Sequence, residues 1–303
     1  YFATLSFQQQ LNYDGDVTDR EFATGMFTQL KNFWNWSTFM IYVPDVYDDA
    51  ALRGGPVVKK RGYTYNSMSL STDARKAISF STSPNFQVRH TGPKSYSLNL
   101  NVTYKPTSQV QLSVGPAWNK NRGLAQFVTS GPDSTNTAFF GRRYIFAQID
   151  QRTLSMSTRA NVTFTPTLTL EAYAQPLIAS GDYRTFREFV APRRPEFHDF
   201  VLGKDLTRTI GDGPAQYTVD VDGNGPAQPI SFSDPNFNFR SLRGNAVLRW
   251  EYHPGSTLFF VWQQSRSETA GVGDFDFGRD RDALFSAHPD NIFLVKATYW
   301  IAF

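Results

Sequence analysis

Strict alternation between apolar and polar side chains, sustained over long stretches, constrains the fold of this chain more than any other feature. Residues 96–105 read YSLNLNVTYK, in which every second side chain is apolar or aromatic and the others are Ser, Asn, Thr or Lys. The same pattern recurs in residues 109–119, 153–163 and 167–175. A period of two is that of a β-strand with one apolar and one polar face, and helical periodicity is nearly missing. The sequence therefore predicts an all-β protein.

Two all-β architectures alternate in this way, a soluble β-sandwich and a transmembrane β-barrel. The predicted strands are about 10 to 13 residues long, whereas globular strands average about five or six and tilted membrane strands need about 9 to 11. Tyr96 and Tyr104 stand at the two ends of an apolar face, where an interfacial girdle of aromatic residues is expected. Short and long connections also alternate. We therefore predict a transmembrane antiparallel up-and-down β-barrel, with a large soluble β-sandwich as the alternative.

The connections also indicate the number of strands. A hairpin at residues 150–152 would place the long connection 120–143 on the side of the short turns, which outer-membrane barrels keep periplasmic. If residues 144–165 instead form one long strand with a bulge near Asp150, the long connection falls on the extracellular side with the other long loops. The chain then forms one barrel domain over residues 1–303, with both ends periplasmic and a long extracellular loop at residues 180–238. The twelve predicted strands are 1–13, 20–31, 35–47, 62–72, 77–90, 96–105, 109–119, 144–165, 167–179, 239–252, 256–268 and 291–303.

Composition excludes several classes of partner and site. The 303 residues carry 30 basic and 27 acidic side chains, and no basic stripe is interleaved with stacking aromatics, so nucleic acid is not an expected partner. Cysteine is absent, which excludes disulfides and thiolate metal sites. No apolar run approaches the ~18 residues of a membrane helix. The chain starts at Tyr1 without an initiator Met or a signal-peptide pattern, so we expect a processed or truncated chain.

The last thirteen residues, NIFLVKATYWIAF, resemble the C-terminal signal of outer-membrane proteins. Apolar residues occupy every second position before a terminal Phe, as a closing strand with a lipid-facing side requires. We expect Phe293 and Val295 to face lipid, and Lys296 and Thr298 to face the interior. The predicted partners are therefore membrane lipid, lipopolysaccharide and the outer-membrane assembly machinery. The residues assigned to the assembly signal are Tyr299, Ile301 and Phe303.

Longer stretches resemble a large uncharacterised family of Gram-negative outer-membrane proteins. They include SGDYRTFREFVAPRRPEF, AQYTVDVDGNG and SFSDPNFNFRSLRGNAVLRWEYHPGSTLFFVWQQSR, with KNFWNW, RGGP and AQIDQRTLSM earlier in the chain. The resemblance implies a β-barrel of unknown function, which in that family follows a domain similar to family-nine carbohydrate-binding modules. It offers no active site to carry over. We expect this chain to lack both the carbohydrate-binding-like domain and the family's first barrel strands.

The predicted interior face carries charges among many Ser, Thr, Asn and Gln side chains. These charges either pair across neighbouring strands in a hydrated interior or form a slightly cationic selectivity lining, which would favour anions or acidic sugars. Tyr173, beside this face, either stacks on a sugar ring or packs in an aromatic girdle. The predicted lumen residues are Arg89, Lys105, Arg159, Glu171, Arg243, Arg249, Glu251 and Lys296.

The loop at residues 180–238 is too long to be a mere connection. We expect an ordered extracellular cap or docking surface for partner proteins rather than an inward plug, formed by Arg184, Arg187, Arg193 and Arg194 among phenylalanines. Asp220, Asp222 and Asn224 on a Gly-bent loop are a candidate calcium site. Ser231 stands where a twelve-residue calcium loop requires Glu, so a hairpin tip is the preferred interpretation and no cofactor is expected.

We expect no enzymatic activity. None of the four histidines has a Ser two positions on or forms a helical zinc pair, although a pair such as His198 with Asp274 stays open. Two functions remain, a porin-like channel for polar solutes, including saccharides, and a structural barrel that docks partner proteins through its loops. Water in the lumen would favour the first function, and a packed lumen would favour the second.

Overall fold

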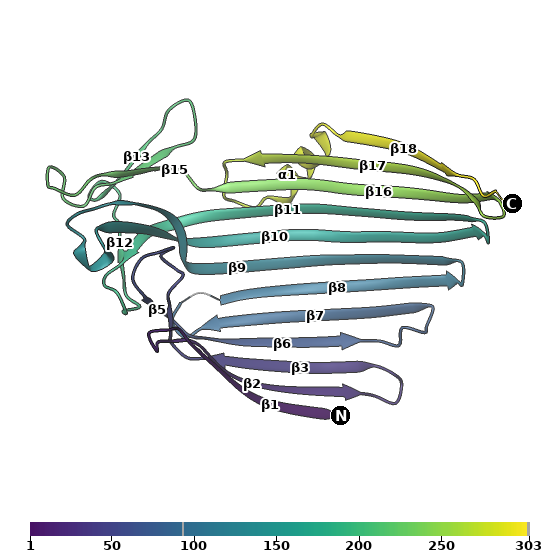
Figure 1. Ribbon diagram of the computed structural model, residues 1–303, viewed down its shortest axis with the longest axis horizontal. Helices are drawn as coiled ribbons and strands as arrows, with labels where there is room; N and C mark the ends of the chain where they lie inside the picture. The colour runs from purple at the N-terminus through teal and green to yellow at the C-terminus, as the bar shows by residue number, and fades with distance from the viewer. Residues whose placement is uncertain (93, 302–303) are drawn as a thin grey trace.

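One antiparallel sheet dominates the computed structural model, which describes residues 1–92 and 94–301 (Figure 1). Its strands follow one another in chain order, so it is an up-and-down meander, and the short β12 (Phe197–Asp199) pairs beside β11. The all-β antiparallel prediction is confirmed. The strands of the meander are β1 (Phe2–Leu11), β2 (Val17–Gln29), β3 (Asn35–Val43), β6 (Tyr63–Ser71), β7 (Ile78–Arg89), β8 (Lys94–Thr107), β9 (Val110–Pro132), β10 (Arg142–Thr165), β11 (Leu168–Phe189), β16 (Phe237–His253), β17 (Ser256–Ala270) and β18 (Asp290–Thr298).

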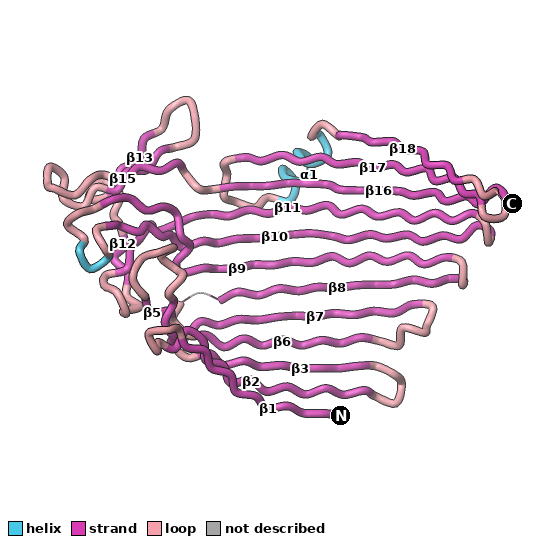
Figure 2. The backbone as a smooth tube through the Cα atoms, in the orientation of Figure 1, coloured by secondary structure: helices cyan, strands magenta, loops and turns pink. Residues whose placement is uncertain are grey.

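The connections separate into two ends of the sheet, as the sequence predicted (Figure 2). Tight turns such as residues 166–167 and 254–255 lie at one end, which we call the turn end and where β1 begins and β18 also ends. The longer connections gather at the opposite end, the loop end. The prediction that residues 144–165 form one strand is confirmed, because β10 pairs with β9 and β11 along its length. Its bulge lies near Asp150, where the register shifts after Ala147.

Two predicted boundaries at the loop end are wrong. Residues 120–132 continue β9, so the connection to β10 is only residues 133–141, with a short 3₁₀ helix at Thr137–Phe139. The predicted loop 180–238 starts later, because β11 runs to Phe189. Alternation is lost in both stretches, although the backbone ladder continues. At this end the chain covers both faces of the sheet, with Phe127 and Phe146 packed on one side and Val128 and Ile145 on the other. A strand that is packed on both faces does not alternate between apolar and polar side chains, which explains why the pattern ended early.

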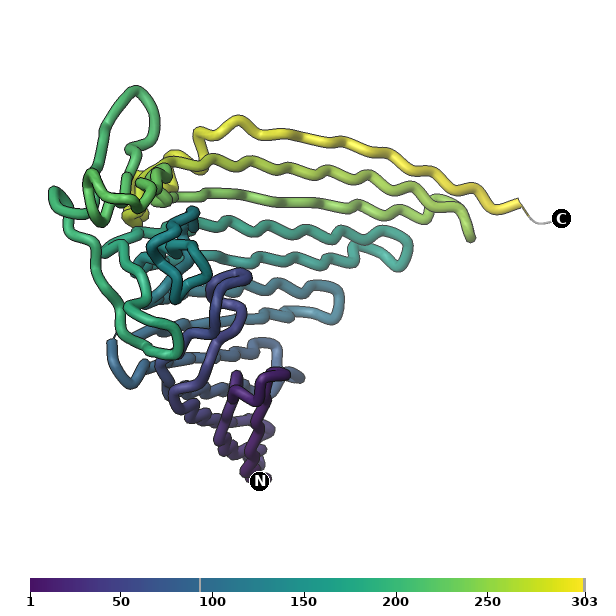
Figure 3. Tube along the Cα trace, turned by 60° about the vertical axis from the view of Figure 1, so that its left-hand side comes forward, coloured from purple at the N-terminus to yellow at the C-terminus, as the bar shows by residue number. Residues whose placement is uncertain are grey.

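The sheet is bent into a trough and is not closed (Figure 3). Over the described residues, β1 pairs only with β2 and β18 only with β17, so these two strands are its edges. The predicted strand 291–303 is shorter than expected, because β18 ends at Thr298 and the Trp300 N–H donates to Ser256 Oγ at 3.0 Å. Phe303 lies outside the described residues.

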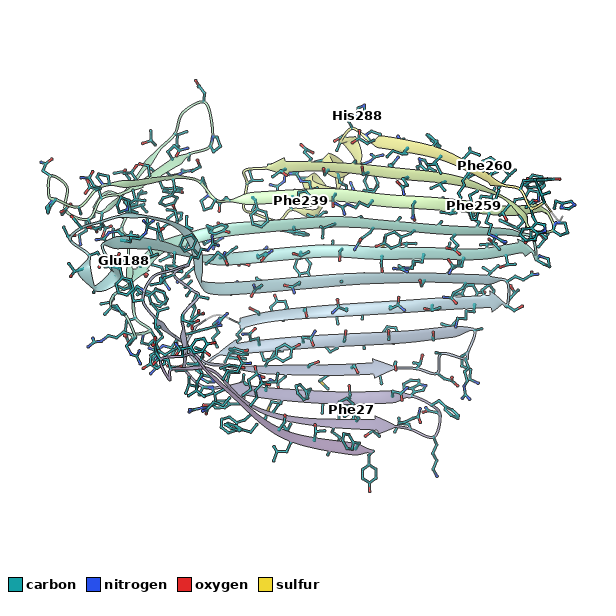
Figure 4. All side chains as sticks on the ribbon, in the orientation of Figure 1. Phe27, Glu188, Phe239, Phe259, Phe260 and His288 are labelled. Atoms are coloured by element: carbon teal, nitrogen blue, oxygen red, sulfur yellow. The ribbon has the colours of Figure 1, made fainter. Side chains whose placement is uncertain are left out.

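The strand register gives the sheet one apolar and one polar face. Leu98 pairs with Trp118, Trp118 with Leu154 and Leu154 with Ile178, so these side chains share one face across four strands. Most large exposed apolar side chains of the strands lie on this apolar face. On the polar face, Ser97, Asn119 and Thr153 pair in the same way. Figure 4 shows side chains projecting from both sides of the strands, with Phe259 and Phe260 labelled on β17.

The buried core lies at the loop end, on both sides of β10 and β11. On the polar face, the connection at residues 44–62, which contains β4 (Val46–Asp48) and β5 (Val58–Lys60), packs Leu52 and Val58 against Tyr144, Phe146 and Phe189. This contact joins strands far apart in the sheet, so the polar face is the concave one. On the apolar face a small sheet, β13 (Leu206–Thr209), β14 (Gln216–Val219) and β15 (Ile230–Ser233), packs against Ile145, Ala147 and Phe186.

The connection between β17 and β18 holds α1 (Phe277–Ser286), the only α-helix within residues 1–92 and 94–301. The carboxylate of Asp276 caps the helix by accepting from the Arg279 N–H. Asp280 is fully buried, where Asn238 Nδ2 donates to it at 3.0 Å. In the part of the chain that the structure describes, no helix is long and apolar enough to span a membrane.

Candidate functional site

The eight residues predicted to line an interior share the polar face. The register pairs Arg159 with Tyr173 and Arg249 with Phe259, and Phe259 with Lys296. They are spread along the trough rather than gathered, since Arg89 lies near the loop end while Lys105 donates to the Ala74 carbonyl at the turn end. By pairing or alternation, the register places the remaining residues, Glu171, Arg243 and Glu251, on the same face.

Some of these charges have local partners. Arg249 Nη2 donates to Glu251 Oε2 at 3.1 Å, and the Arg159 guanidinium lies 5.0 Å from the centre of the Tyr173 ring. The Tyr173 hydroxyl in turn donates to Gln175 Oε1 at 2.7 Å. Tyr173 therefore contacts its own neighbours on the polar face, and Arg249 is paired with Glu251 of its own strand.

A pocket of about 550 Å³ lies on the polar face towards the loop end. Amide and hydroxyl groups dominate its polar-face lining, and they partly satisfy one another, since Asn85 Nδ2 donates to Ser97 Oγ at 3.1 Å and Ser95 Oγ to Asn121 Oδ1 at 2.9 Å. Sequence reasoning missed this pocket, because it singled out charged residues. Alternation placed Ser97 and Asn119 on one face, whereas Asn121 belongs to a stretch that the sequence analysis assigned to a connection, and only the pairing of β8, β9 and β10 brings them together. The lining residues on the polar face are Tyr65, Asn85, Gln87, Ser95, Ser97, Asn119, Asn121, Gln151 and Thr153, and the pocket also touches Phe86, Tyr96 and Lys120.

A second pocket of about 320 Å³ adjoins the first at what we call the mouth, between residues 44–62 and strands β9 to β11. Asn121 and Gln151 line both pockets. Its walls combine the rings of Phe127, Phe146, Phe189 and Phe197 with the cations Lys59, Lys60, Arg61 and Arg89. The loop end of the trough is thus narrowed by a folded connection. Of its cations, Lys60 lies 4.0 Å from Asp48, and Arg61 lies 3.2 Å from Asp45 and 3.6 Å from Glu196.

The four arginines of the long loop do not form one group. Arg184 is exposed beside Asp182, and Arg194 is also exposed. Arg187 is buried, 2.7 Å from Asp199, with its guanidinium over the Phe197 ring. Arg193 reaches Asp16 in the β1–β2 connection, and its backbone N–H donates to the Val57 carbonyl. Residues 190–196 therefore close over the mouth, while the bulk of the loop lies on the opposite face.

A charged cluster beside the mouth holds His198. Its ring nitrogens lie 3.7 Å from Glu188 and 3.6 Å from Asp205, so its neighbours are these carboxylates, whereas Asp274 is held by Arg279. Burial raises the pKa of Glu188, which Figure 4 labels at the loop end, although Arg143 opposes the shift. Burial also opposes ionisation of Asp133, but hydrogen bonds from Thr135 and Arg143 outweigh it and lower the Asp133 pKa. These pairings explain the cluster as a brace between β9, β10 and β11.

The candidate calcium residues form a hairpin tip between β14 and β15. Asp220 Oδ1 accepts from the Gly223 N–H at 2.9 Å and Asp222 Oδ2 from the Ala227 N–H at 3.0 Å, while Gly223 has a φ of 62°. Both carboxylates thus stabilise the loop backbone, and Asn224 is exposed. Among the described residues no group of three His, Cys, Asp or Glu side chains is placed to hold a metal ion.

The C-terminal segment places its apolar side chains and Lys296 on opposite faces of the sheet. Phe293 pairs with Trp262 and Val295 with Phe260 on the apolar face, and Lys296 pairs with Phe259 on the polar face. Of the residues assigned to an assembly signal, Tyr299 and Ile301 are exposed beyond the end of β18.

Three comparisons place the chain among known proteins. The profile of a family described as "Domain of unknown function (DUF5916)" matches residues 1–191 and 212–303. A solved structure titled "NanC porin structure in rhombohedral crystal form" aligns with 99% of this chain and 100% of that chain, at 8% sequence identity and a TM-score of 0.27. A comparison with curated proteins gave no match.

Proposed function

The chain belongs to the family of the domain of unknown function DUF5916, and we propose that it forms an outer-membrane β-barrel channel for polar solutes in a Gram-negative bacterium. The observation that carries this proposal is the division of the long meander into an apolar face that is exposed and a polar face that lines a trough. In water an exposed apolar face of this extent is unfavourable, whereas lipid is a suitable neighbour for it.

The height of the apolar face supports a membrane location. On β8 the apolar positions run from Tyr96 to Tyr104, and on β9 from Val110 to Trp118, with Leu98, Val102, Leu112 and others more than a third exposed. Each strip spans about nine residues, which matches the about 9 to 11 residues that a tilted strand needs to cross the hydrocarbon core. Tyr and Trp stand at its margins, as in the aromatic girdles of such barrels.

The polar face supports transport of solutes that hydrogen-bond through neutral groups. The larger pocket presents amides and hydroxyls next to Tyr65. Sugars are recognised by such groups together with aromatic rings, so saccharides are the solutes we propose, in agreement with the carbohydrate-binding-like domain expected from the family resemblance. The cations at the mouth would add a preference for acidic saccharides.

Single-channel conductance in planar bilayers tests the proposal. The full chain is measured beside a variant in which residues 49–57 are replaced by a short Gly-Ser linker, which removes the segment that narrows the mouth. We expect conductance in both and a larger value in the variant. Absence of conductance in both proteins, when both are inserted, would rule out a channel.

A docking function is the second candidate, and one observation favours it. Val201, Leu202 and Ile210, in the long connection between β11 and β16, are each more than half exposed. Exposed apolar side chains at the tip of an ordered loop are suited to a protein contact. Replacing all three with Ser should abolish cross-links to neighbouring surface proteins on intact cells while conductance stays unchanged. Unchanged cross-links would count against docking.

A further inference from the structure

A belt of basic side chains crosses the apolar face just beyond its apolar strip. The register pairs Lys120 with Arg152, Arg122 with Asp150 and Asp150 with Asp182, which places these side chains on the same face as Trp118 and Leu154. Arg184 adjoins them, with its Nε donating to Asp182 Oδ2 at 2.6 Å. We call Lys120, Arg122, Arg152 and Arg184, with the two carboxylates, the basic belt.

The charges of the basic belt do not balance. Asp150 is shared by three cations: its Oδ2 lies 3.2 Å from Arg122 Nε and 3.9 Å from Lys120 Nζ, and its Oδ1 lies 3.6 Å from Arg152 Nε. Asp182 neutralises Arg184. The belt therefore holds four positive and two negative charges, and one carboxylate cannot neutralise three cations. An additional anion would relieve this surplus.

The guanidinium groups remain accessible although their shared carboxylate is not. The side chain of Asp150 is 13% exposed, whereas those of Arg122, Arg152 and Arg184 are 45%, 37% and 66% exposed. An arginine fork matches the geometry of a phosphate group and binds it through two hydrogen bonds. The exposed guanidinium groups of the belt are thus accessible to a ligand from outside the protein.

The position of the belt identifies those surroundings. Lys120 and Arg152 stand two residues beyond Trp118 and Leu154, a rise of about 7 Å along each strand. If the apolar strip spans the hydrocarbon core, the belt lies at the depth of the lipid headgroups on the loop-end side.

Two neighbouring segments enclose the belt. Further along β10, the small sheet β13–β15 covers Ile145 and Ala147 on the same face. Beside it, the connection after β17 brings Gly273 against the backbone of Asp182 and sets the Phe275 ring edge-on to Trp118, with ring centres 5.1 Å apart. The basic belt therefore has polypeptide beyond it and beside it, and it adjoins the apolar strip at Trp118 and Leu154.

We propose that the basic belt binds the phosphate group of a lipid headgroup in the outer leaflet. This inference rests on the membrane location proposed above and goes beyond the transport of solutes. The acyl chains would lie along the apolar strip, and the phosphate oxygens would accept from Arg122 and Arg152 while Lys120 and Arg184 add positive charge.

The test is lipid retention by the full chain in vesicles. Phosphatidylcholine vesicles contain a small share of either bisphosphorylated lipid A or the same lipid with both phosphates removed, and the lipid that stays bound after detergent extraction is measured by mass spectrometry. We expect wild-type protein to retain about tenfold more of the phosphorylated lipid, as about 1.4 kcal/mol of charge-assisted contacts implies. Equal retention of both lipids would overturn the proposal, and this comparison needs no variant.

Variants locate the site. Arg122→Gln with Arg152→Gln should reduce the preference about tenfold, whereas Arg159→Gln with Arg243→Gln, the same charge change on the polar face, should leave it intact. An unchanged preference in the first variant would refute the assignment. Displacement of the lipid by inorganic phosphate at equal concentration would identify a site for free phosphate instead. Conductance is recorded in the same vesicles, so a conducting channel without lipid preference refutes this inference alone, and failure to insert refutes the membrane location itself.

Discussion

Arg193 and Asp16 join two connections that emerge from opposite parts of the sheet, with Arg193 Nη1 donating to Asp16 Oδ2 at 2.9 Å. Asp16 follows β1 at one edge, whereas Arg193 follows β11, far along the meander. The Arg193 guanidinium also lies 4.4 Å from the centre of the Tyr47 ring. The pair therefore spans the trough and holds its bent shape at the loop end.

This pair should respond to acid. The hydrogen bond from Arg193 lowers the pKa of Asp16 below its ordinary value of 3.8. A carboxyl group with a lowered folded pKa contributes stability above its unfolded pKa and loses it as the pH falls through the folded value. Because the native chain has no cysteine, spin labels on Tyr13→Cys and Arg194→Cys report the distance across the mouth. We expect a narrow distribution at pH 7 and 5 that broadens as the pH falls below 3.8 and through the lowered pKa of Asp16.

Replacement of the carboxylate separates the pair from general acid effects. Asp16→Asn should give a broad distance distribution at every pH, because a neutral amide does not attract the guanidinium. Asp14→Asn, in the same connection, should behave as the unaltered chain does. A narrow distribution in Asp16→Asn at pH 7 would show that other contacts hold the mouth.

The aromatic cluster at the mouth should keep residues 44–62 folded. Phe146 is 2% exposed, with the rings of Phe127 and Phe189 centred 5.7 and 5.3 Å away. Truncating such a ring costs about 3–5 kcal/mol of local stability. In Phe146→Ala, trypsin should cut after Lys59 or Lys60 at least about 100-fold faster, which corresponds to about 2.8 kcal/mol. Phe164→Ala removes a ring that is 53% exposed at the turn end and should leave the rate unchanged.

The features that could be predicted from the sequence are those that depend on local pattern, namely the strands, their two faces and the order of the connections. The alternation in residues 96–105 identified β8 and its two faces, because one face of this strand has an apolar neighbour and the other a polar one. The order of short and long connections identified β10 as a single strand, since only an unbroken β10 keeps the short turns together. Phe293 and Lys296 were assigned to opposite faces for the same reason, and the pairing of β17 with β18 agrees.

Features that depend on pairing or on distant contacts were not predictable. Asn121 and Gln151 are thirty positions apart and become neighbours only through the register of β9 and β10. Residues 120–132 have no alternation, because beyond the apolar strip both faces of the sheet are covered by other parts of the chain, which Phe127 and Val128 contact on opposite sides. The packing of Leu52 on Phe146 depends on the curvature of the whole sheet, which no local pattern encodes.

Asn121 and Gln151 should contribute to solute binding, since both line the two pockets of the polar face. In Asn121→Ala with Gln151→Ala, two hydrogen-bonding side chains are lost, at about 0.5–1.5 kcal/mol each. Apparent affinity for a test disaccharide, measured from interruptions of the single-channel current, should fall about tenfold. Conductance of salt alone should not decrease, because no charge is removed. Asn66→Ala, an amide on the apolar face opposite Phe86, is the matched control and should not affect interruptions.

Phe293 and Leu294 offer a direct test of which face meets lipid, because they are adjacent on β18 and pair on opposite faces. Phe293 pairs with Trp262 on the apolar face, whereas Leu294 pairs with Val261 on the polar face. An arginine facing lipid near the middle of a bilayer destabilises a barrel by about 2–4 kcal/mol, while one facing a hydrated interior costs much less. Phe293→Arg should therefore lower the free energy of unfolding in vesicles by that amount, measured by urea titration, and Leu294→Arg should change it by less than about 1 kcal/mol. Equal losses in the two variants would mean that β18 is not a lipid-facing strand with the present register, and a larger loss in Leu294→Arg would reverse the assignment of the faces.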